Sequence, residues 1–251
     1  MVALLAAAAC EEHATPAPRP TATGPVRAVT APDGGTIRVV EQGFTAGTSR
    51  TGRPIVSYGF VLQNTSRHWT ARNTVVRVSR TTATGRSVTD YSLSPIWTVG
   101  AIMAPGQRAG VGQNGRVDLA GTTNVSIRFR TTVWTPAKTK LPVNGASLAP
   151  AALTADAVTT QRDPGGPGLP ATVSFTVHSG YPIVLNKTWT DVIYRDVDGR
   201  IVGGTNTRLY GRALTTSHPP GSSRGRLVDQ NGPPAGADLT RTGVYLYPDS
   251  G

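Results

Sequence analysis

The pattern G-x-S-x-G occurs at residues 221–225, and it can mark a nucleophilic serine. A nucleophile elbow holds such a serine on a sharp turn between a strand and a helix, with a histidine and an acid as partners. Here Pro219 and Pro220 precede the pattern, and the residues after it are typical of a short strand. We therefore interpret the pattern as a turn and do not predict Ser223 as a nucleophile.

A second group of residues has the types needed to bind calcium. Asp196, Asp198 and Gly199 resemble the opening of a calcium-binding loop, but residues 200–202 supply none of the further oxygen ligands that such a loop requires. Asp and Gly at this spacing are typical of a hairpin turn. We therefore expect a turn at this position.

Three histidines complete the set of residues that could do chemistry. His68, His178 and His218 lack the spacing of zinc ligands, so we expect them to be exposed or hydrogen-bonded. No acid–base pair is evident in the sequence around them, which places a hydrolase last among the possible functions. The sequence therefore predicts no catalytic residue, no metal site and no cofactor.

Charge is the strongest functional signal in the chain. Residues 35–145 contain 14 Lys or Arg but only three acidic residues, a net charge of +11, whereas residues 1–34 carry −1 and residues 146–251 carry +1. The first half therefore holds the entire excess of positive charge. Such an excess favours anionic partners, for which we consider lipid headgroups, cell-wall polymer or a protein.

The composition indicates that β-strands position these charges. Charged residues make up 16% of the chain and aromatic residues 6%, with 29 Gly and 20 Pro. Frequent β-branched residues between turn-forming residues are typical of an all-β protein. The chain also repeats itself, because landmark residues recur at a shift of 114 or 115 positions. These landmarks are Phe60 with Phe175, Gly85 with Gly199, and Pro105 with Pro220.

Each repeat is expected to form about seven short strands, which predicts an immunoglobulin-like sandwich. Alternation along residues 124–134 and 74–80 places arginines opposite the apolar side chains. Because the third and last strands of such a sandwich share a sheet, we expect these arginines to share one outer face. The predicted anion-binding residues are Arg77, Arg128 and Arg130, with Arg80 and Arg108 near the edge of the face.

The N-terminus predicts export and a lipid anchor. Residues 2–9 form a short apolar run, and Ala7-Ala8-Ala9-Cys10 resembles a bacterial lipobox, in which the cysteine is lipidated. The run is too short to span a bilayer. The following residues, 11–35, are rich in Pro, Ala and Thr, which indicates a disordered tether. An exported location argues against nucleic acid as the partner of the positive charge.

The second repeat resembles the FxLYD-type domains of bacterial lipoproteins. Residues 192–200, with the sequence VIYRDVDGR, carry the likeness, and the first repeat keeps Gly85 and Arg86 at the corresponding turn. The resemblance implies an immunoglobulin-like fold on an exported protein and implies no enzymatic activity. The predicted organisation is a signal peptide with a lipobox at 1–10, a tether at 11–35, a basic sandwich at 36–136, an irregular connector at 137–150, and a second sandwich at 151–251.

These observations predict a lipid-anchored protein outside the cytoplasm that acts as a non-enzymatic binding or structural module. An accessory subunit of a membrane complex is an alternative function. An envelope hydrolase is the last alternative.

Overall fold

The computed structural model describes residues 24–49, 51–88, 96–164, 169–207 and 217–248, with the backbone alone for 96–101. The described chain is built almost entirely from β-strands, as the sequence predicts. Within these ranges, no helix has the length and apolar character needed to cross a membrane. The strands of the first half and of the connector are β1 (Val26–Ala28), β2 (Ile37–Thr48), β3 (Pro54–Asn64), β4 (Trp69–Thr82), β5 (Ile96–Met103), β6 (Arg108–Arg116), β7 (Thr122–Pro136), β8 (Leu141–Val143) and β9 (Ala146–Leu148). The strands of the second half are β10 (Leu153–Arg162), β11 (Ala171–Ser179), β12 (Thr188–Arg195), β13 (Ile201–Asn206), β14 (Gly221–Asp229) and β15 (Asp238–Pro248).

The two halves share one strand order. In the first half the sheets are β2-β3-β6 and β1-β7-β4-β5, and in the second they are β10-β11-β14 and β13-β12-β15. All of these pairings are antiparallel. The sheet β2-β3-β6 therefore corresponds to β10-β11-β14, and β7-β4-β5 corresponds to β15-β12-β13. The common order agrees with the repeat in the sequence.

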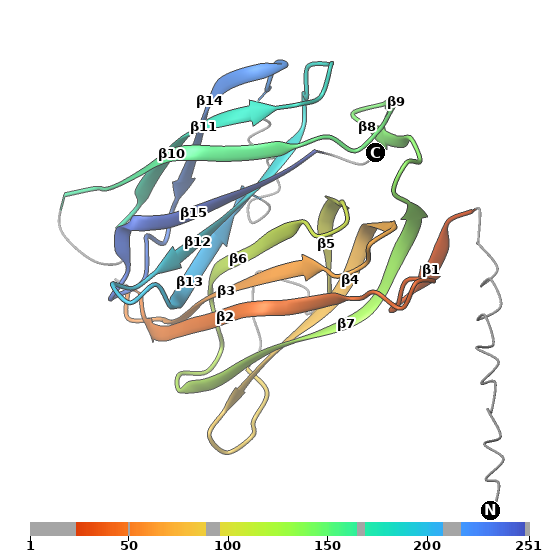
Figure 1. Ribbon diagram of the computed structural model, residues 1–251. Helices are drawn as coiled ribbons and strands as arrows, with labels where there is room; N and C mark the ends of the chain where they lie inside the picture. Colours follow the sequence, from red (N-terminus) through yellow and green to blue (C-terminus); the bar gives the residue numbers. More distant parts are fainter. Residues whose placement is uncertain (1–23, 50, 89–95, 165–168, 208–216, 249–251) are drawn as a thin grey trace, which may run out of the picture.

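The four sheets form a stack, in which sheets β2-β3-β6 and β13-β12-β15 are the two inner layers (Figure 1). Strands β12 and β13 contact β3 and β6 directly across this seam between the halves. The outermost layers are β1-β7-β4-β5 in the first half and β10-β11-β14 in the second. The halves therefore present non-equivalent sheets to each other, so the packing is head-to-tail rather than two-fold.

Large apolar side chains fill the interior of each sandwich. The first core contains Tyr58, Phe60 and Trp134, and the second contains Phe175 and Tyr194, all of them buried. They come from alternate positions of their strands, because successive side chains of a strand point to opposite faces. Burial of such side chains contributes about 1.5–3 kcal/mol each, which makes the two cores the main source of stability.

The seam is packed differently, through glycines and buried polar groups. A side chain at Gly112 would lie 2.7 Å from the backbone nitrogen of Thr205, and one at Gly204 would lie 2.6 Å from the Cα atom of Gly112. Ser57 Oγ accepts a hydrogen bond from the Gly204 N–H at 3.0 Å, and the Gly112 N–H donates to Asp191 Oδ1 at 3.1 Å. The two inner sheets can approach this closely only because glycines face each other.

Two parts of the predicted organisation need correction. The tether was expected to extend to residue 35, but Val26–Ala28 form β1 and pair with β7, because Val26 and Ala28 pack against the first core. The connector was expected to be irregular, but it forms the hairpin β8–β9 with Asn144 and Gly145 in the left-handed region that an Asn-Gly turn requires. Leu141 in this hairpin is buried in the second core.

Candidate anion-binding face

Three of the predicted arginines lie together on the outermost sheet of the first half. Strands β4 and β7 pair so that Arg77 is directly opposite Arg128, and Arg130 lies in the adjacent bulge. All three side chains are exposed. Their strand neighbours Val76 and Val78 are buried in the first core, so the arginines occupy the opposite face of the sheet. The expected outer arginine face, defined by Arg77, Arg128 and Arg130, is confirmed as a geometric arrangement.

The carboxylates of Asp33 and Glu41 are engaged away from this face. Asp33 accepts hydrogen bonds from Ser66 Oγ at 2.7 Å and from the Gly35 N–H at 3.0 Å, which hold the loop that precedes β4. Glu41 pairs with Arg195 at 2.9 Å across the seam. In the described parts of the protein, Arg77, Arg128 and Arg130 form no ion pair with a carboxylate. Their charge is therefore available to a partner.

The expectation that Arg80 lies near the edge of this face is wrong. Arg80 has the same strand parity as Val76 and Val78, so its side chain points into the first sandwich and is only 4% exposed. Its guanidinium lies over the ring of Tyr58, 5.8 Å from the ring centroid, a cation–π contact. Sequence alternation placed Arg80 on the apolar side of β4, and the ring of Tyr58 is one of the groups that the buried guanidinium contacts there.

Arg108 is also separate from the arginine face. It begins β6, which belongs to the inner sheet of the first half. Its guanidinium lies 3.6 Å from Glu41 Oε1, and Glu41 in turn contacts Arg195 of the second half. Arg108 therefore belongs to an ion cluster at the seam. The sequence could not reveal this position, because the partner of Glu41 lies 154 residues further along the chain.

Sequence reasoning also missed Arg27 on the outer face. Arg27 was assigned to the tether, but it lies on β1 opposite Val133 of β7 and is exposed. Val26 and Ala28 on either side of it pack against the first core, so Arg27 points outward. The alternation of apolar, charged and apolar residues in this short segment could have predicted a strand with Arg27 pointing outward.

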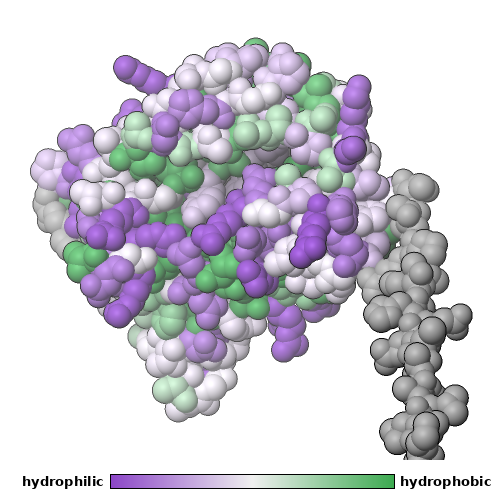
Figure 2. Space-filling model, viewed as in Figure 1, coloured by the Kyte–Doolittle hydropathy of each residue, from purple (hydrophilic) through white to green (hydrophobic). Residues whose placement is uncertain are grey.

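Hydrophobic residues form no extended area on the visible surface of the molecule. Figure 2 shows hydrophilic side chains spread over this face, with hydrophobic residues in small separate patches. The exposed large hydrophobic residues of the described chain are Val29, Val184 and Val197. Large apolar patches mark apolar partners, so this surface favours recognition by charge and hydrogen bonds.

The residues weighed for nucleophilic catalysis lie on β14. The interpretation of this pattern as a turn is wrong, because residues 221–225 all belong to β14. Ser223 is therefore within a strand and not between a strand and a helix. Its Oγ atom lies 2.9 Å from Nδ1 of the buried His218. Burial lowers the pKa of His218, which keeps this imidazole neutral. The Ser223–His218 contact joins two neighbouring segments, in agreement with a structural role for the G-x-S-x-G residues.

The second half does contain an acid–base pair, contrary to our expectation. His178 Nε2 lies 2.9 Å from Asp156 Oδ2, and His178 Nδ1 lies 3.0 Å from Ser222 Oγ. The side chains of His178 and Asp156 are 44% and 64% exposed. Serine hydrolases bury the acid and supply hydrogen-bond donors to the oxyanion, because electrostatic stabilisation is strongest where water is excluded. The exposed His178–Asp156 pair lacks this burial. The pair was missed because strand pairing, not sequence spacing, brings these residues together.

The structure gives the Asp196–Gly199 segment the geometry of a hairpin turn. Asp196 Oδ1 accepts hydrogen bonds from the Asp198 and Arg200 N–H groups, and Gly199 has φ of 83°. The hairpin interpretation is confirmed. Within the described residues, no group of three or more His, Cys, Asp or Glu side chains is placed to hold a metal ion. Cys10 lies outside the described residues.

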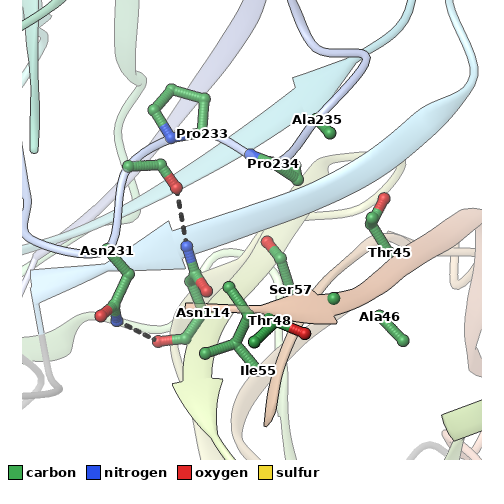
Figure 3. Close-up of a pocket in the computed structure, with 12 residues that line it drawn as sticks. Thr45, Ala46, Thr48, Ile55, Ser57, Asn114, Asn231, Pro233, Pro234 and Ala235 are labelled. Atoms are coloured by element: carbon green, nitrogen blue, oxygen red, sulfur yellow. Dashed lines mark hydrogen bonds between the residues drawn. The ribbon is translucent and has the colours of Figure 1, made fainter. Parts of the chain in front are cut away.

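A small cavity of about 170 Å³ lies at the edge of the seam. Figure 3 shows Asn114 of β6 at its wall, where Asn114 Nδ2 donates to the Gly232 carbonyl at 2.8 Å. Asn231 Nδ2 donates in return to the Asn114 carbonyl at 3.1 Å. Ligand pockets usually exceed about 300 Å³, so this cavity is small for a binding site. These paired amide contacts fix the second half against the first.

Asp229 lies at the start of the loop that forms one wall of this cavity. It is buried and accepts a hydrogen bond from the Tyr194 hydroxyl at 3.0 Å. Burial raises the pKa of Asp229 to about 6, although hydrogen bonds from Tyr194 and the Asn231 N–H oppose this shift. Burial, reinforced by the neighbouring Asp229, raises the pKa of Tyr194 well above its usual value. Asp229 is thus a buried titratable group of the second half.

No family model matches the chain, and no curated protein matches it. The arrangement of residues in the structure therefore carries the functional argument.

Proposed function

We propose that this protein is an exported, lipid-anchored and non-enzymatic module, and that its arginine face docks on anionic lipid headgroups. The observation that carries the proposal is the direct cross-strand pairing of Arg77 with Arg128. Like charges directly opposite each other destabilise a sheet. The stability of the fold therefore does not account for this pair, whereas an anionic surface would relieve the repulsion.

The position of the face supports a membrane as the partner. The arginine face belongs to an outermost, solvent-exposed sheet, which a flat headgroup layer can contact over several residues at once. The chain enters this same sheet through β1, the first strand after the proposed anchor residue Cys10. Anchor and face would therefore hold the protein from the same side.

Lipidation of Cys10 is part of this proposal and has its own test. One acyl chain binds membranes only marginally, so stable anchoring needs at least a second chain or a basic surface. A protein with Cys10→Ser should leave the membrane fraction of its native host. Retention of this variant in the membrane fraction at the parent level would contradict a lipid anchor.

The docking face can be tested with the non-lipidated Cys10→Ser protein and vesicles. The parent should bind vesicles containing phosphatidylglycerol at low salt and dissociate as salt rises, because exposed charges are screened over about 8 Å at physiological salt. Each basic residue near such a surface contributes about 1 kcal/mol. Replacing Arg77, Arg128 and Arg130 with Gln should therefore weaken binding roughly 100-fold.

A matched control separates the face from total charge. Arg53, Arg116 and Arg200 are exposed elsewhere on the molecule, and their replacement with Gln removes the same charge. This control should bind nearly as well as the parent. Equal losses in both triple variants would contradict a specific face. Binding of the parent to purified wall polymer, but not to anionic vesicles, would replace the membrane with wall polymer as the partner.

A further inference from the structure

The outermost sheet of the second half carries a shallow groove of about 470 Å³. This groove is lined by residues 174–176 of β11, residues 224–226 of β14, and Ala157 of β10. The groove runs across three neighbouring strands on the face that points away from the second core, because Val173, Phe175 and Val177 fill that core.

A strained residue shapes one side of this groove. Ala157 has φ of 46°, in the left-handed region that non-glycine residues rarely adopt. It lies in a bulge of β10, where the pairing with β11 shifts between Asp156 and Thr159. Bulges bend a strand and redirect its side chains, and they are frequent next to functional sites. The bulge therefore places Ala157 at one side of the groove.

The groove presents two cations and two hydroxyls. Arg224 is opposite Thr176 and Arg226 is opposite Ser174 in the strand pairing, so all four side chains share one face. Arg226 also donates to Thr172 Oγ1 at 3.2 Å, which orients its guanidinium. Within the described chain, neither arginine forms an ion pair with a carboxylate. Guanidinium groups and hydroxyls are the donors that recognise phosphate and carboxylate oxygens.

The nearest acidic side chain, Asp156, is in line with Thr176 and Arg224 in the strand pairing and offsets only part of the charge of the two arginines. Asp156 pairs with His178 at 2.9 Å, and His178 contacts Ser222 at the next outward-facing position of β14. Of the other described acids of this half, Asp198 pairs with Arg200, Asp238 pairs with Arg241, Asp196 accepts hydrogen bonds within its own hairpin turn, and Asp191 and Asp229 are buried. The exposed Asp163 follows the end of β10. The groove therefore remains cationic although the second half as a whole is nearly neutral.

The groove and the arginine face lie on opposite sides of the four-sheet stack (Figure 1). Packed sheets are about 10 Å apart, so roughly 30 Å of protein separates the two surfaces. This exceeds the screening length of about 8 Å at physiological salt, so each surface acts independently. One flat membrane cannot contact both. When the arginine face lies on a membrane, the groove points away from it.

We infer that this groove binds an extended anionic polymer of the cell wall, through phosphate or carboxylate groups that repeat along its chain. Arg224 and Arg226 are two residues apart on one strand, about 7 Å, so a chain with repeated charges engages both arginines. A groove that runs across neighbouring strands suits a single extended chain better than a flat headgroup layer. Together with the proposed membrane docking, on which this inference partly rests, the protein would link the membrane to the wall polymer.

The experiment uses the Cys10→Ser protein, phosphatidylglycerol vesicles and fluorescent polyanions. Polyphosphate provides phosphate groups, polygalacturonate provides carboxylates on a sugar chain, and polyglutamate represents an acidic protein. Vesicle-bound parent protein should recruit polyphosphate or polygalacturonate to the pellet. Replacing Arg224 and Arg226 with Gln should reduce this recruitment at least tenfold while vesicle binding is retained. The control pair Arg53→Gln and Arg116→Gln should recruit like the parent.

A solution arm separates this inference from the membrane proposal. The variant that lacks Arg77, Arg128 and Arg130 should lose vesicle binding yet still bind the polyanion in fluorescence anisotropy. If the parent bound the polymer but failed to bind vesicles, only the membrane proposal would be overturned. Recruitment by the Arg224/Arg226 variant at the parent level would overturn the groove. Binding of polyglutamate alone would also overturn it, because the partner would then be an acidic protein.

Discussion

The corresponding sheets β2-β3-β6 and β10-β11-β14 have opposite surroundings, and their outward-facing residues differ accordingly. In the first half, Gly59 pairs with Gly112 and Val61 pairs with Gly110, and these residues face the seam. The corresponding residues of the second half, 115 positions later, are Ser174 and Thr176. They pair with Arg226 and Arg224 at the surface.

The difference shows how one strand order can serve two purposes. The inner sheet has glycine where a second sheet must approach closely, and the outer sheet has arginine where only solvent or a ligand is adjacent. The other pair of corresponding sheets shows the reverse arrangement. Arg77 faces outward on β4, whereas Asp191 on the corresponding strand β12 is buried at the seam, where it accepts a hydrogen bond from the Gly112 N–H.

The largest expected effect comes from exchanging the residue types of the two sheets. Gly112 of the inner sheet corresponds to Arg226 of the outer sheet, so Gly112→Arg introduces the arginine of the second half at the seam. The new side chain would collide with the backbone of β12 and β13 and would bury a charge, so we expect a loss of about 4 kcal/mol or more. Urea unfolding would measure it.

The exposed Gly47 offers a matched control for this substitution. A side chain at Gly47 meets nothing within 4 Å, so Gly47→Arg should change the free energy of unfolding by less than about 1 kcal/mol. If Gly112→Arg were as stable as Gly47→Arg, the close packing of the seam would be wrong.

A smaller effect should distinguish the two cores by their response to pH. Only the second core contains Asp229, whose folded pKa of about 6 exceeds its ordinary value of 3.8. The folded state therefore binds this proton more tightly than the unfolded state, and stability falls as pH rises from about 4 to 6. The shift of roughly two units corresponds to about 3 kcal/mol.

Replacing Asp229 with Asn should remove this part of the pH dependence. The stability difference between parent and Asp229→Asn, measured by urea unfolding from pH 4 to pH 7.5, should change by about 3 kcal/mol in favour of the variant. The difference isolates Asp229 because other titrating groups are common to both proteins. A difference that does not vary with pH would contradict a buried, mostly uncharged Asp229 at low pH.

The sequence predicted those features that depend on local alternation. The all-β architecture, the repeat and the outward position of Arg77, Arg128 and Arg130 follow from strand periodicity. The seam was not predicted, because alternation alone does not show that both faces of β3 are buried. Arg80 was misplaced for a related reason: a charged residue on the apolar side of a strand needs a partner such as Tyr58, and only the folded structure supplies it.

The groove of the second half was also beyond sequence reasoning. Arg224 and Arg226 can be read from the sequence. Only the pairing of β10, β11 and β14 shows that the bulge at Ala157 and the hydroxyls of β11 lie beside them. The near-neutral total charge of the second half concealed this local excess, because most of its described acidic residues lie away from the groove.

The orientation of the protein on a membrane tests the central claim most directly. In the Cys10→Ser protein, single cysteines at Ser126 and at Thr154 place an environment-sensitive fluorophore on the outer face of β7 or β10, at exposed positions. With phosphatidylglycerol vesicles, we predict a blue shift and quenching by a lipid-borne quencher for the label at residue 126, and neither for the label at residue 154. An equal response of the two labels, or a response at residue 154 alone, would contradict docking through the arginine face.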